Sequence, residues 1–365
     1  MQLERTAFLA YTVGWTLCIS AILSPPSIEW DRSSLVLVEA NAHYARIVRH
    51  PNGTLFACYD RDHQIWVEPN HNEGKSWDET PTAVYKAEVG NVTNAELLPL
   101  QNGTLLCFFN HRPFDDKHPY AILASRSADL GKTWSPPEVL FAARETWGEG
   151  CWEPAAIEHP SGEIQVFFAN EQPFPDTTEQ EISMMRSLDQ GLTWEPPKRV
   201  IFRAGHRDGM PVPCLLQNGS TAVAIEDNGM RGPHFKPVIT VSKDFSRELH
   251  PISGTSLQRW SALRKPLEAP VQTGAPYLRQ MPTGETILSF QQKCKHRSEP
   301  NMVVCVGTSD CRDFDNPTEP FPVDNDTAAR WNSLFVKSTD VITAVSDTTI
   351  DGKRGVWAID GKLQR

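Results

Sequence analysis

Two glutamates in apolar surroundings are the residues of this sequence best suited to acid–base chemistry. Glu153 stands in the stretch Gly150-Cys-Trp-Glu-Pro154, and Glu226 ends the apolar run Ala-Val-Ala-Ile-Glu. An apolar environment disfavours the charged form of a carboxyl group and so raises its pKa towards the range in which it can donate a proton. Two carboxyl groups at one opening can divide proton donation and attack between them. The question is which elements could bring these glutamates together.

A repeated hairpin is the clearest sign of those elements. Short apolar runs enclose a turn built on Asn-Gly or a related pair, and the turn glycines are Gly53, Gly103, Gly162, Gly219 and Gly284. Their spacings are 50, 59, 57 and 65 residues, and a weaker sixth copy has its turn near Asp340. Asn-Gly supplies the positive φ angles of a type I′ turn, so each copy predicts a tight two-stranded hairpin.

A second repeat lies between the hairpins. The segments Ser127–Trp134 and Ser187–Trp194 share the pattern S-x-D-x-G-x-T-W, and Asn70–Trp77 is a degenerate copy. The Asp side chain can accept hydrogen bonds from nearby amides, the Gly takes the turn angle, and the Trp packs between strands. The tryptophan that ends each copy is therefore expected to be structural.

These repeats predict an all-β fold, a six-bladed β-propeller with four-stranded antiparallel blades. The sixth blade runs out of chain after three strands, and the N-terminal run SSLVLVEA is expected to complete it and close the ring. One propeller domain is expected over residues 33–365. Residues 1–24 place one Arg before an uncharged apolar run, which predicts a signal peptide or an N-terminal anchor. The protein is thus expected to be secreted or periplasmic.

Chain direction within the blades would place both glutamates at one mouth of the central channel. If strand one of each blade runs down the channel, the start of strand one and the end of strand two lie on the same face. Glu153 begins strand one of the third blade, and Glu226 ends strand two of the fourth. The strand-two ends are polar nearly every time: Asp60, Asn110, Ala169 followed by Asn170 and Glu171, Glu226, Gln291 and Asp347. Such a ring suits a sugar, whose hydroxyls need many directed hydrogen bonds.

The prediction for this face is a catalytic pair, Glu153 and Glu226, surrounded by substrate-binding side chains. Tryptophans could stack on a sugar ring, Trp147 included, and polar groups beside the GMP segment could bond hydroxyls. Asp208 is a third carboxylate within reach. The predicted binding residues are Arg46, Asp60, Arg61, Asn110, Trp152, His206, Arg207, Asp208, Gln291 and Trp331.

The amino-acid composition limits the classes of molecule that the protein is expected to bind. The formal net charge is -10 and there is no Lys/Arg run, which argues against nucleic acid. No CxxC pair or His cluster has metal spacing, so no metal and no cofactor are expected. The expected partner is a carbohydrate substrate, with no membrane partner beyond the possible anchor, and the expected state is a monomer. Cys294 and Cys305 flank a short polar loop and could be either bridged or free.

The repeat Ser127–Trp134 resembles the Asp-box, or bacterial neuraminidase repeat, of the sialidase superfamily. Within that superfamily, the WEP segment and GMPVPCLLQNGSTAVAIED are similar to the segments that carry the two catalytic glutamates of glycoside hydrolase family 93 exo-arabinanases. The resemblance implies a six-bladed propeller that cleaves at the end of a glycan chain with retention of configuration. It also implies Glu153 as acid/base and Glu226 as nucleophile. Retention corresponds to carboxyl groups about 5–5.5 Å apart.

Two alternatives stay open. The first blade resembles the start of a sialidase, with Arg46 and Arg61 in the places of two arginines. Sialidases hold the sialic acid carboxylate with three arginines and use a Tyr nucleophile in the last blades, whereas the last Tyr here is Tyr277. An exo-α-sialidase, or neuraminidase, with Arg207 or Arg279 as third arginine is thus one alternative. The other is a non-catalytic propeller that binds glycan or protein, because Asp-boxes also occur in such propellers.

Overall fold

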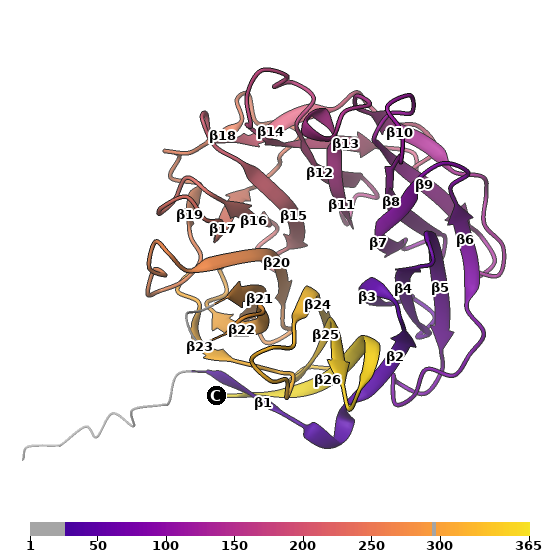
Figure 1. Ribbon diagram of the computed structural model, residues 1–365, viewed down its shortest axis with the longest axis vertical. Coiled ribbons are helices and arrows are strands. Elements are labelled where there is room, and N and C mark those ends of the chain that lie inside the picture. Colours follow the sequence, from indigo (N-terminus) through magenta and orange to yellow (C-terminus); the bar gives the residue numbers. More distant parts are fainter. Residues whose placement is uncertain (1–25, 294–296) are drawn as a thin grey trace, which may run out of the picture.

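Six β-sheets surround a central axis in the computed structural model, which describes residues 26–293 and 297–365 (Figure 1). Within each blade the neighbouring strands pair antiparallel. The predicted six-bladed β-propeller is confirmed. Blades one to three contain β3 (His43–Arg49), β4 (Leu55–Arg61), β5 (Gln64–Asn70) and β6 (Thr82–Lys86); β7 (Asn91–Pro99), β8 (Leu105–Arg112), β9 (Ala121–Ser127) and β10 (Glu138–Ala142); β11 (Cys151–Glu158), β12 (Ile164–Asn170), β13 (Glu181–Ser187) and β14 (Lys198–Phe202).

The remaining blades follow the same order, with a short strand added at the edge of blade three. Blades four to six contain β15 (Asp208–Leu215), β16 (Thr221–Asp227), β17 (Lys236–Ser242) and β19 (Arg259–Ser261); β20 (Gln272–Gln280), β21 (Thr286–Lys293), β22 (Asn301–Gly307) and β23 (Asp315–Thr318); β24 (Ala329–Val336), β25 (Val341–Ile350) and β26 (Lys353–Gln364) with β1 (Ser27–Trp30) and β2 (Val36–Ala40). The added strand is β18 (Ile252–Ser253), parallel to β14, and the two short 3-10 helices are η1 (Arg32–Ser34) and η2 (Trp147–Glu149). The strands that line the axis are β3, β7, β11, β15, β20 and β24 (Figure 1).

The hairpin turns between strands one and two differ in type from the sequence prediction. In the first, the amide of Gly53 donates to the carbonyl of His50 at 2.8 Å, and the amide of His50 donates to the carbonyl of Thr54 at 2.9 Å. In blades one to five only the glycine of this turn has a positive φ, and the turn of blade six has no glycine. The turns are therefore three-residue loops, a type I turn followed by a left-handed glycine, and the expected type I′ geometry is wrong. The Asn52 side chain accepts from the amide of Thr54 at 3.0 Å, which explains why Asn precedes the glycine.

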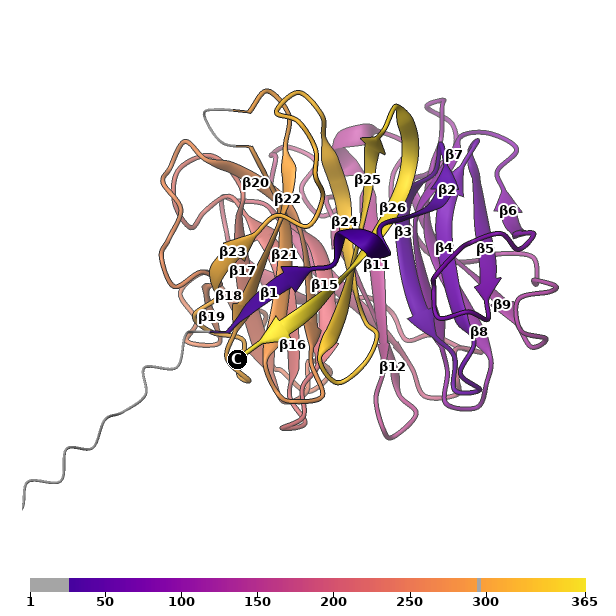
Figure 2. The same ribbon diagram turned by 90° about the horizontal axis from the view of Figure 1, so that it is seen from below.

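The Asp-box turns have the structural role that was predicted. Asp129 accepts the amide of Thr133 at 2.9 Å and its hydroxyl at 2.6 Å, and Asp189 repeats both bonds with Thr193. Hydrogen bonds from Thr133 come first among the causes that lower the pKa of Asp129 to about 2. Trp134 and Trp194 pack against hydrophobic clusters between neighbouring strands. These turns join strands three and four, at the end of the channel opposite to the starts of the first strands (Figure 2).

The N-terminal segment closes the ring, as predicted. Both β2 and β1 pair antiparallel with β26, so the outer edge of blade six comes from the other end of the chain (Figure 2). β1 begins at Ser27, earlier than the predicted start of the propeller at residue 33. Because blade six combines both ends of the chain, its outer contacts tie residues more than 300 positions apart.

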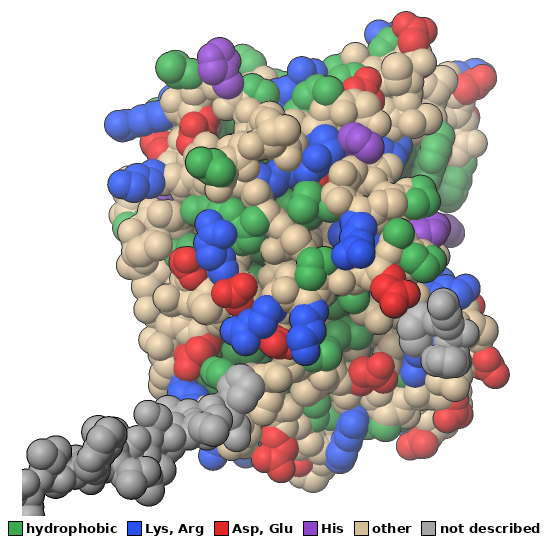
Figure 3. All heavy atoms as spheres, turned by 90° about the vertical axis from the view of Figure 1, so that its left-hand side faces the viewer, with side chains coloured by type: hydrophobic (Ala, Val, Ile, Leu, Met, Phe, Trp, Pro, Cys, Tyr) green, Lys and Arg blue, Asp and Glu red, His purple; other side chains and the backbone are tan. Residues whose placement is uncertain are grey.

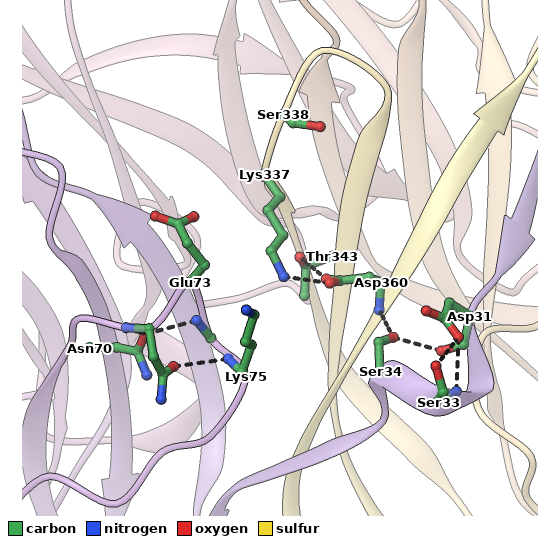
Figure 4. A network of polar contacts seen from close by, with 12 residues as sticks. Asp31, Ser33, Ser34, Asn70, Glu73, Lys75, Lys337, Ser338, Thr343 and Asp360 are labelled. Atoms are coloured by element: carbon green, nitrogen blue, oxygen red, sulfur yellow. Dashed lines mark hydrogen bonds and ion pairs between the residues drawn. The ribbon is translucent and has the colours of Figure 1, made fainter.

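Asp360 on β26 is the centre of the polar contacts that hold this closure (Figure 4). Its carboxylate binds Lys337 and accepts the hydroxyl of Thr343 at 2.6 Å. Its amide donates to the hydroxyl of Ser34 at 2.8 Å, and its carbonyl accepts the amide of Asp31 at 2.9 Å. The carboxylate therefore braces blade six internally, while the backbone of the same residue binds the N-terminal segment.

Two sequence predictions concern residues outside the described ranges: the leader at 1–24, and Cys294 as one half of a disulfide. Among the residues that are described, no helix has the length and apolar character needed to span a bilayer. On the outer flank of blades four and five, Lys and Arg side chains are interspersed with Asp and Glu (Figure 3). This flank therefore offers no broad basic patch to a polyanion.

We predict that Asp360→Ala lowers the free energy of unfolding by about 1–2 kcal/mol, because Lys337 and Thr343 lose a shared acceptor at a partly exposed site. Urea denaturation followed by tryptophan fluorescence measures this change. The matched control is Asp78→Ala, an exposed aspartate outside the closure. Equal stability of the two variants would contradict the role given to Asp360.

Candidate active site

Each innermost strand contains a β-bulge, and the same position in every bulge has a left-handed backbone. The six residues are Tyr44 (φ 52), Asn94 (φ 55), Glu153 (φ 51), Met210 (φ 46), Ala275 (φ 49) and Trp331 (φ 53). In each blade the strand-one register shifts across this residue. A bulge re-aims a side chain out of the regular alternation of a strand. These six left-handed residues define what we call the mouth of the channel.

The strand register confirms that the strand-two ends predicted from sequence are equivalent to one another. In each blade this residue pairs with the residue just before the left-handed one. The pairs are Asp60 with His43, Asn110 with Thr93, Ala169 with Trp152, Glu226 with Gly209, Gln291 with Gly274 and Asp347 with Arg330. The mouth is therefore lined by two rings, one of left-handed residues and one of strand-two ends.

The carboxylate of Glu226 fits between two glycines. A Cβ atom on Gly209 would stand 3.0 Å from Glu226 Oε1, and one on Gly274 would stand 2.9 Å from Oε2. Oε2 also accepts the amide of Ala275 at 3.0 Å. Neither glycine has a positive φ, so each is required here for the space it leaves rather than for its backbone angle. Gly274 is a site residue that the sequence analysis missed.

Glu153 lies beside Glu226. Its side chain is 22% exposed, and its carboxyl interacts with the amide of Met210, the residue after the glycine that pairs with Glu226. Burial raises the pKa of Glu153, while Arg112, 3.7 Å away, lowers it. Burial and then the charge of Glu153 raise the pKa of Glu226 to about 8. The two carboxyl groups are thus close enough to affect each other and are poorly solvated.

Arg112 is a second residue that the sequence analysis missed. Its Nε donates to Asn110 at 2.9 Å, its Nη2 donates to Asn94, and its guanidinium lies 5.1 Å from the centre of the Trp152 ring. Arg112 lies two positions after Asn110 on β8, and residues at this spacing share a face of a strand. That alternation was the available signal.

Tyr44 is the third missed residue. Its ring stacks on Trp331 with centroids 4.5 Å apart, which joins blades one and six at the mouth. Burial raises the pKa of Tyr44 well above its usual range, and Arg112, Glu153 and Asp60 all act on it. A neutral phenol therefore faces the carboxylates across the mouth.

The structure brings several other predicted residues to the mouth, and most of them form hydrogen bonds or ion pairs with other residues of the protein. The Asn110 side chain donates to the carbonyl of Cys151 at 2.9 Å, so it ties blade two to blade three. Arg207 binds Glu171 and acts on the pKa values of both catalytic candidates. Gln291 accepts the amide of Trp331 at 3.4 Å. Asp60 accepts the hydroxyl of Thr93 at 2.9 Å, and burial raises its pKa to about 7.

Three aromatic residues from blades two and three form a cluster around Trp152, the residue before Glu153. Trp152 is buried, 4.9 Å from the ring centre of Tyr120 and 4.6 Å from that of Trp147. Trp147 on η2 is 64% exposed. His206 lies in the loop before β15 and is half-buried. Within the described residues, no group of His, Cys, Asp and Glu is arranged to hold a metal ion.

Three predicted binding residues do not reach the mouth. Asp208 is fully buried, because Arg259 binds both of its carboxylate oxygens and also binds Asp227. Arg46 lies further down the channel, with its Nε 3.4 Å from Glu96. Arg61 binds Glu39 at 2.8 Å and covers the ring of Trp66, on the side of blade one away from the pair. All three side chains have protein partners in the structure, and a role of these residues in substrate binding stays a prediction.

Gly274→Ala should impair the site without unfolding the protein. The added Cβ meets only the ends of two flexible side chains, those of Glu226 and Gln291, so the carboxylate must move while the backbone need not. We expect any activity that depends on Glu226 to fall by roughly 100-fold in kcat/KM, since small displacements of a catalytic group are costly. Gly148→Ala is the matched control, because nothing lies within 4 Å of its Cβ. Full activity of Gly274→Ala would show that the position of Glu226 is unimportant.

Comparison with known proteins places this geometry in a family. No curated protein sequence matches the chain. Among solved structures, an α-L-arabinofuranosidase of Fusarium graminearum in complex with arabinobiose is 18% identical, with a TM-score of 0.70, over 92% of this chain and 98% of the other. An α-L-arabinanase of Penicillium chrysogenum is 16% identical, with a TM-score of 0.62, over 91% and 97% of the two chains.

The NanB sialidase of Streptococcus pneumoniae is 10% identical, with a TM-score of 0.60, over 92% of this chain and 70% of the other. These likenesses show a shared propeller fold. The family model of the BNR repeat-like domain matches residues 103–332, which is more than half of the chain and includes both Asp-box repeats and both glutamates. The protein therefore belongs to the BNR repeat-like family.

Proposed function

We propose that the protein is a retaining glycoside hydrolase that acts on the end of a glycan chain through Glu153 and Glu226. The observation that carries this proposal is the pair of interacting carboxyl groups at the mouth, of which one has a pKa of about 8. Cleavage of a glycosidic bond needs one carboxyl group that is protonated and one that is ionised. Low solvation and mutual repulsion favour that state at neutral pH.

The electrostatics of the free site also bear on the two roles. Glu226 holds the proton at neutral pH because its pKa is about 8, whereas Arg112 opposes the rise that burial causes in the pKa of Glu153. This distribution favours Glu226 as proton donor and Glu153 as nucleophile. It is the reverse of the assignment that the family 93 resemblance implies.

The arginines favour a neutral sugar over a sialoside. Arg46 and Arg279 lie on the ring of Tyr277 inside the channel, at 4.9 and 4.4 Å from its centre. The arginines at the mouth, Arg112 and Arg207, already contact Glu153 and Glu171. A substrate carboxylate would have to displace these acids. The arabinobiose complex of the Fusarium structure makes an arabinoside the first substrate to test.

The pair also argues against a purely binding role. Glu226 forms no ion pair with any described residue, and the contact of Glu153 with Arg112 at 3.7 Å is loose. Two acids held close together with a single arginine at 3.7 Å from one of them are costly to fold. Such a cost is characteristic of sites where the charges do chemistry.

We expect Glu153→Gln and Glu226→Gln each to lower kcat/KM by about 10²–10⁴-fold on a panel of aryl glycosides that includes an arabinofuranoside and a sialoside. Glu145→Gln, an exposed neighbour of the site, is the control for mutation of a surface carboxyl. Retention is read from the anomer that first appears in the proton NMR spectrum. If both variants turn over substrate at the parent rate, the catalytic assignment is wrong.

The roles can be separated with a leaving group that needs no protonation. With a very acidic phenol as leaving group, the acid variant should keep its glycosylation step, whereas the nucleophile variant should not. We expect Glu226→Gln to be the variant that is rescued. Rescue of Glu153→Gln instead would restore the order that the resemblance implies.

The pH profile offers an independent check through Arg112. Activity should fall as the pH drops through the pKa of Glu153 and as it rises through about 8, where Glu226 loses its proton. Because Arg112 lowers the pKa of Glu153, Arg112→Gln should move the acid limb of kcat/KM to higher pH. The alkaline limb should stay, and Arg112→Lys should restore the acid limb in part. An unshifted acid limb in Arg112→Gln would rule out Glu153 as the ionised partner.

A further inference from the structure

Two hollows meet along blade six on the mouth side of the propeller. One has a volume of about 260 Å³ and includes Gln291 in its lining, and the other has about 530 Å³ and includes Asp347. Both are lined by Glu299, Arg330 and Trp331, so they are neighbours that share a wall. We call the two together the blade-six trough. The larger hollow has the size of small-molecule sites, which is about 300–1,000 Å³.

The trough begins next to the catalytic pair. A Cβ on Gly274 would stand 3.4 Å from Gln291 Nε2 and 2.9 Å from Glu226 Oε2, so these two side chains are neighbours across that glycine. Gln291 in turn accepts the amide of Trp331. The path from Glu226 to the trough therefore passes through one side chain.

Trp331 connects the mouth with the trough. It is one of the left-handed residues of the mouth, stacks on Tyr44 and lines both hollows. Aromatic rings with one face packed and an edge or face accessible present a rigid apolar surface to a ligand at little entropic cost. The C–H faces of sugar rings fit such surfaces.

The remaining lining of the larger hollow is polar and nearly balanced in charge. His43 and Asp347 are 2.5 Å apart, and Arg330 binds Glu299. Thr349 and Arg354 are exposed in the same wall. Paired charges and hydroxyls offer donors and acceptors together, which suits a neutral polyhydroxyl ligand better than an ion.

We infer that the blade-six trough is a second sugar-binding site, which holds a further neutral unit of the same glycan chain while its end is cleaved between Glu153 and Glu226. This inference rests on the proposed function and specifies its substrate: a chain of several sugars rather than a single glycoside. Chain length should then be recognised by blades five, six and one, and the reacting sugar by blades three and four.

The test is a variant that fills the trough and leaves the mouth alone. Thr349→Trp places a large side chain in the larger hollow, on a residue that contacts neither glutamate. We expect kcat/KM on linear arabino-oligosaccharides to fall by more than tenfold, mainly through KM, and kcat/KM on the aryl arabinofuranoside to stay within twofold. Thr255→Trp, at an exposed loop of blade four, is the matched control.

Each outcome decides one proposal. If Thr349→Trp handles oligosaccharides like the parent, or loses both substrates equally, the trough is not a sugar site. If the parent cleaves no glycoside, the proposed function fails, and calorimetry with arabino-oligosaccharides still tests the trough. In that case the inference is supported if the oligosaccharides bind to the parent protein but not to Thr349→Trp. It is overturned if both proteins bind them equally or if neither binds them.

Discussion

The left-handed residue in each innermost strand is the constraint on which the mouth depends. A non-glycine residue in this conformation costs about 1–2 kcal/mol, and the structure has one in every blade at the same place. Such strain persists only where the surroundings enforce it. In blades four and five the strand-two end accepts the strained amide of the next blade, Glu226 from Ala275 and Gln291 from Trp331, and in blade one the amide of Asn94 lowers the pKa of Asp60.

In blade three the strand-two end cannot accept such an amide, and the left-handed residue of that blade interacts with it instead. Its strand two ends with Ala169, which has no acceptor to offer to Met210 in blade four. The amide of Met210 is met instead by Glu153, the left-handed residue of blade three itself. Glu153, from the ring of left-handed residues, thus interacts with blade four, and Glu226, from the ring of strand-two ends, interacts with blade five. The two acids therefore lie side by side. Each interaction with an amide favours the ionised form, whereas burial raises the pKa of both carboxyl groups.

The sequence predicted the fold correctly wherever a residue type has a single structural role in its local surroundings. Turn glycines, Asp-boxes and alternating strands predicted six blades and the ring of strand-two ends, because each depends on nearby residues only. The closing N-terminal strand was predicted because the sixth blade runs out of chain after three strands. The direction of side chains beyond the bulges was harder to predict from the sequence, because a bulge shifts by one residue the alternation of side chains between the two faces of a strand. Asp208 shows the limit: its partner Arg259 is 51 positions away, and no local pattern announces it. Arg112, by contrast, did have a local signal, because it lies two positions after Asn110 on the same strand.

The same logic explains why the mouth is asymmetric although the fold is nearly regular. Blades three and four contribute acids at the bulge and at the strand-two end, and the glycines of GMP and GAP make room for one of them. Blades six and one contribute aromatic rings at the equivalent positions, Trp331 and Tyr44. Because the backbone of the six bulges is alike, side-chain identity at these positions sets the chemistry of each sector. A sugar that spans the channel would therefore meet acids on one side and an aromatic wall on the other.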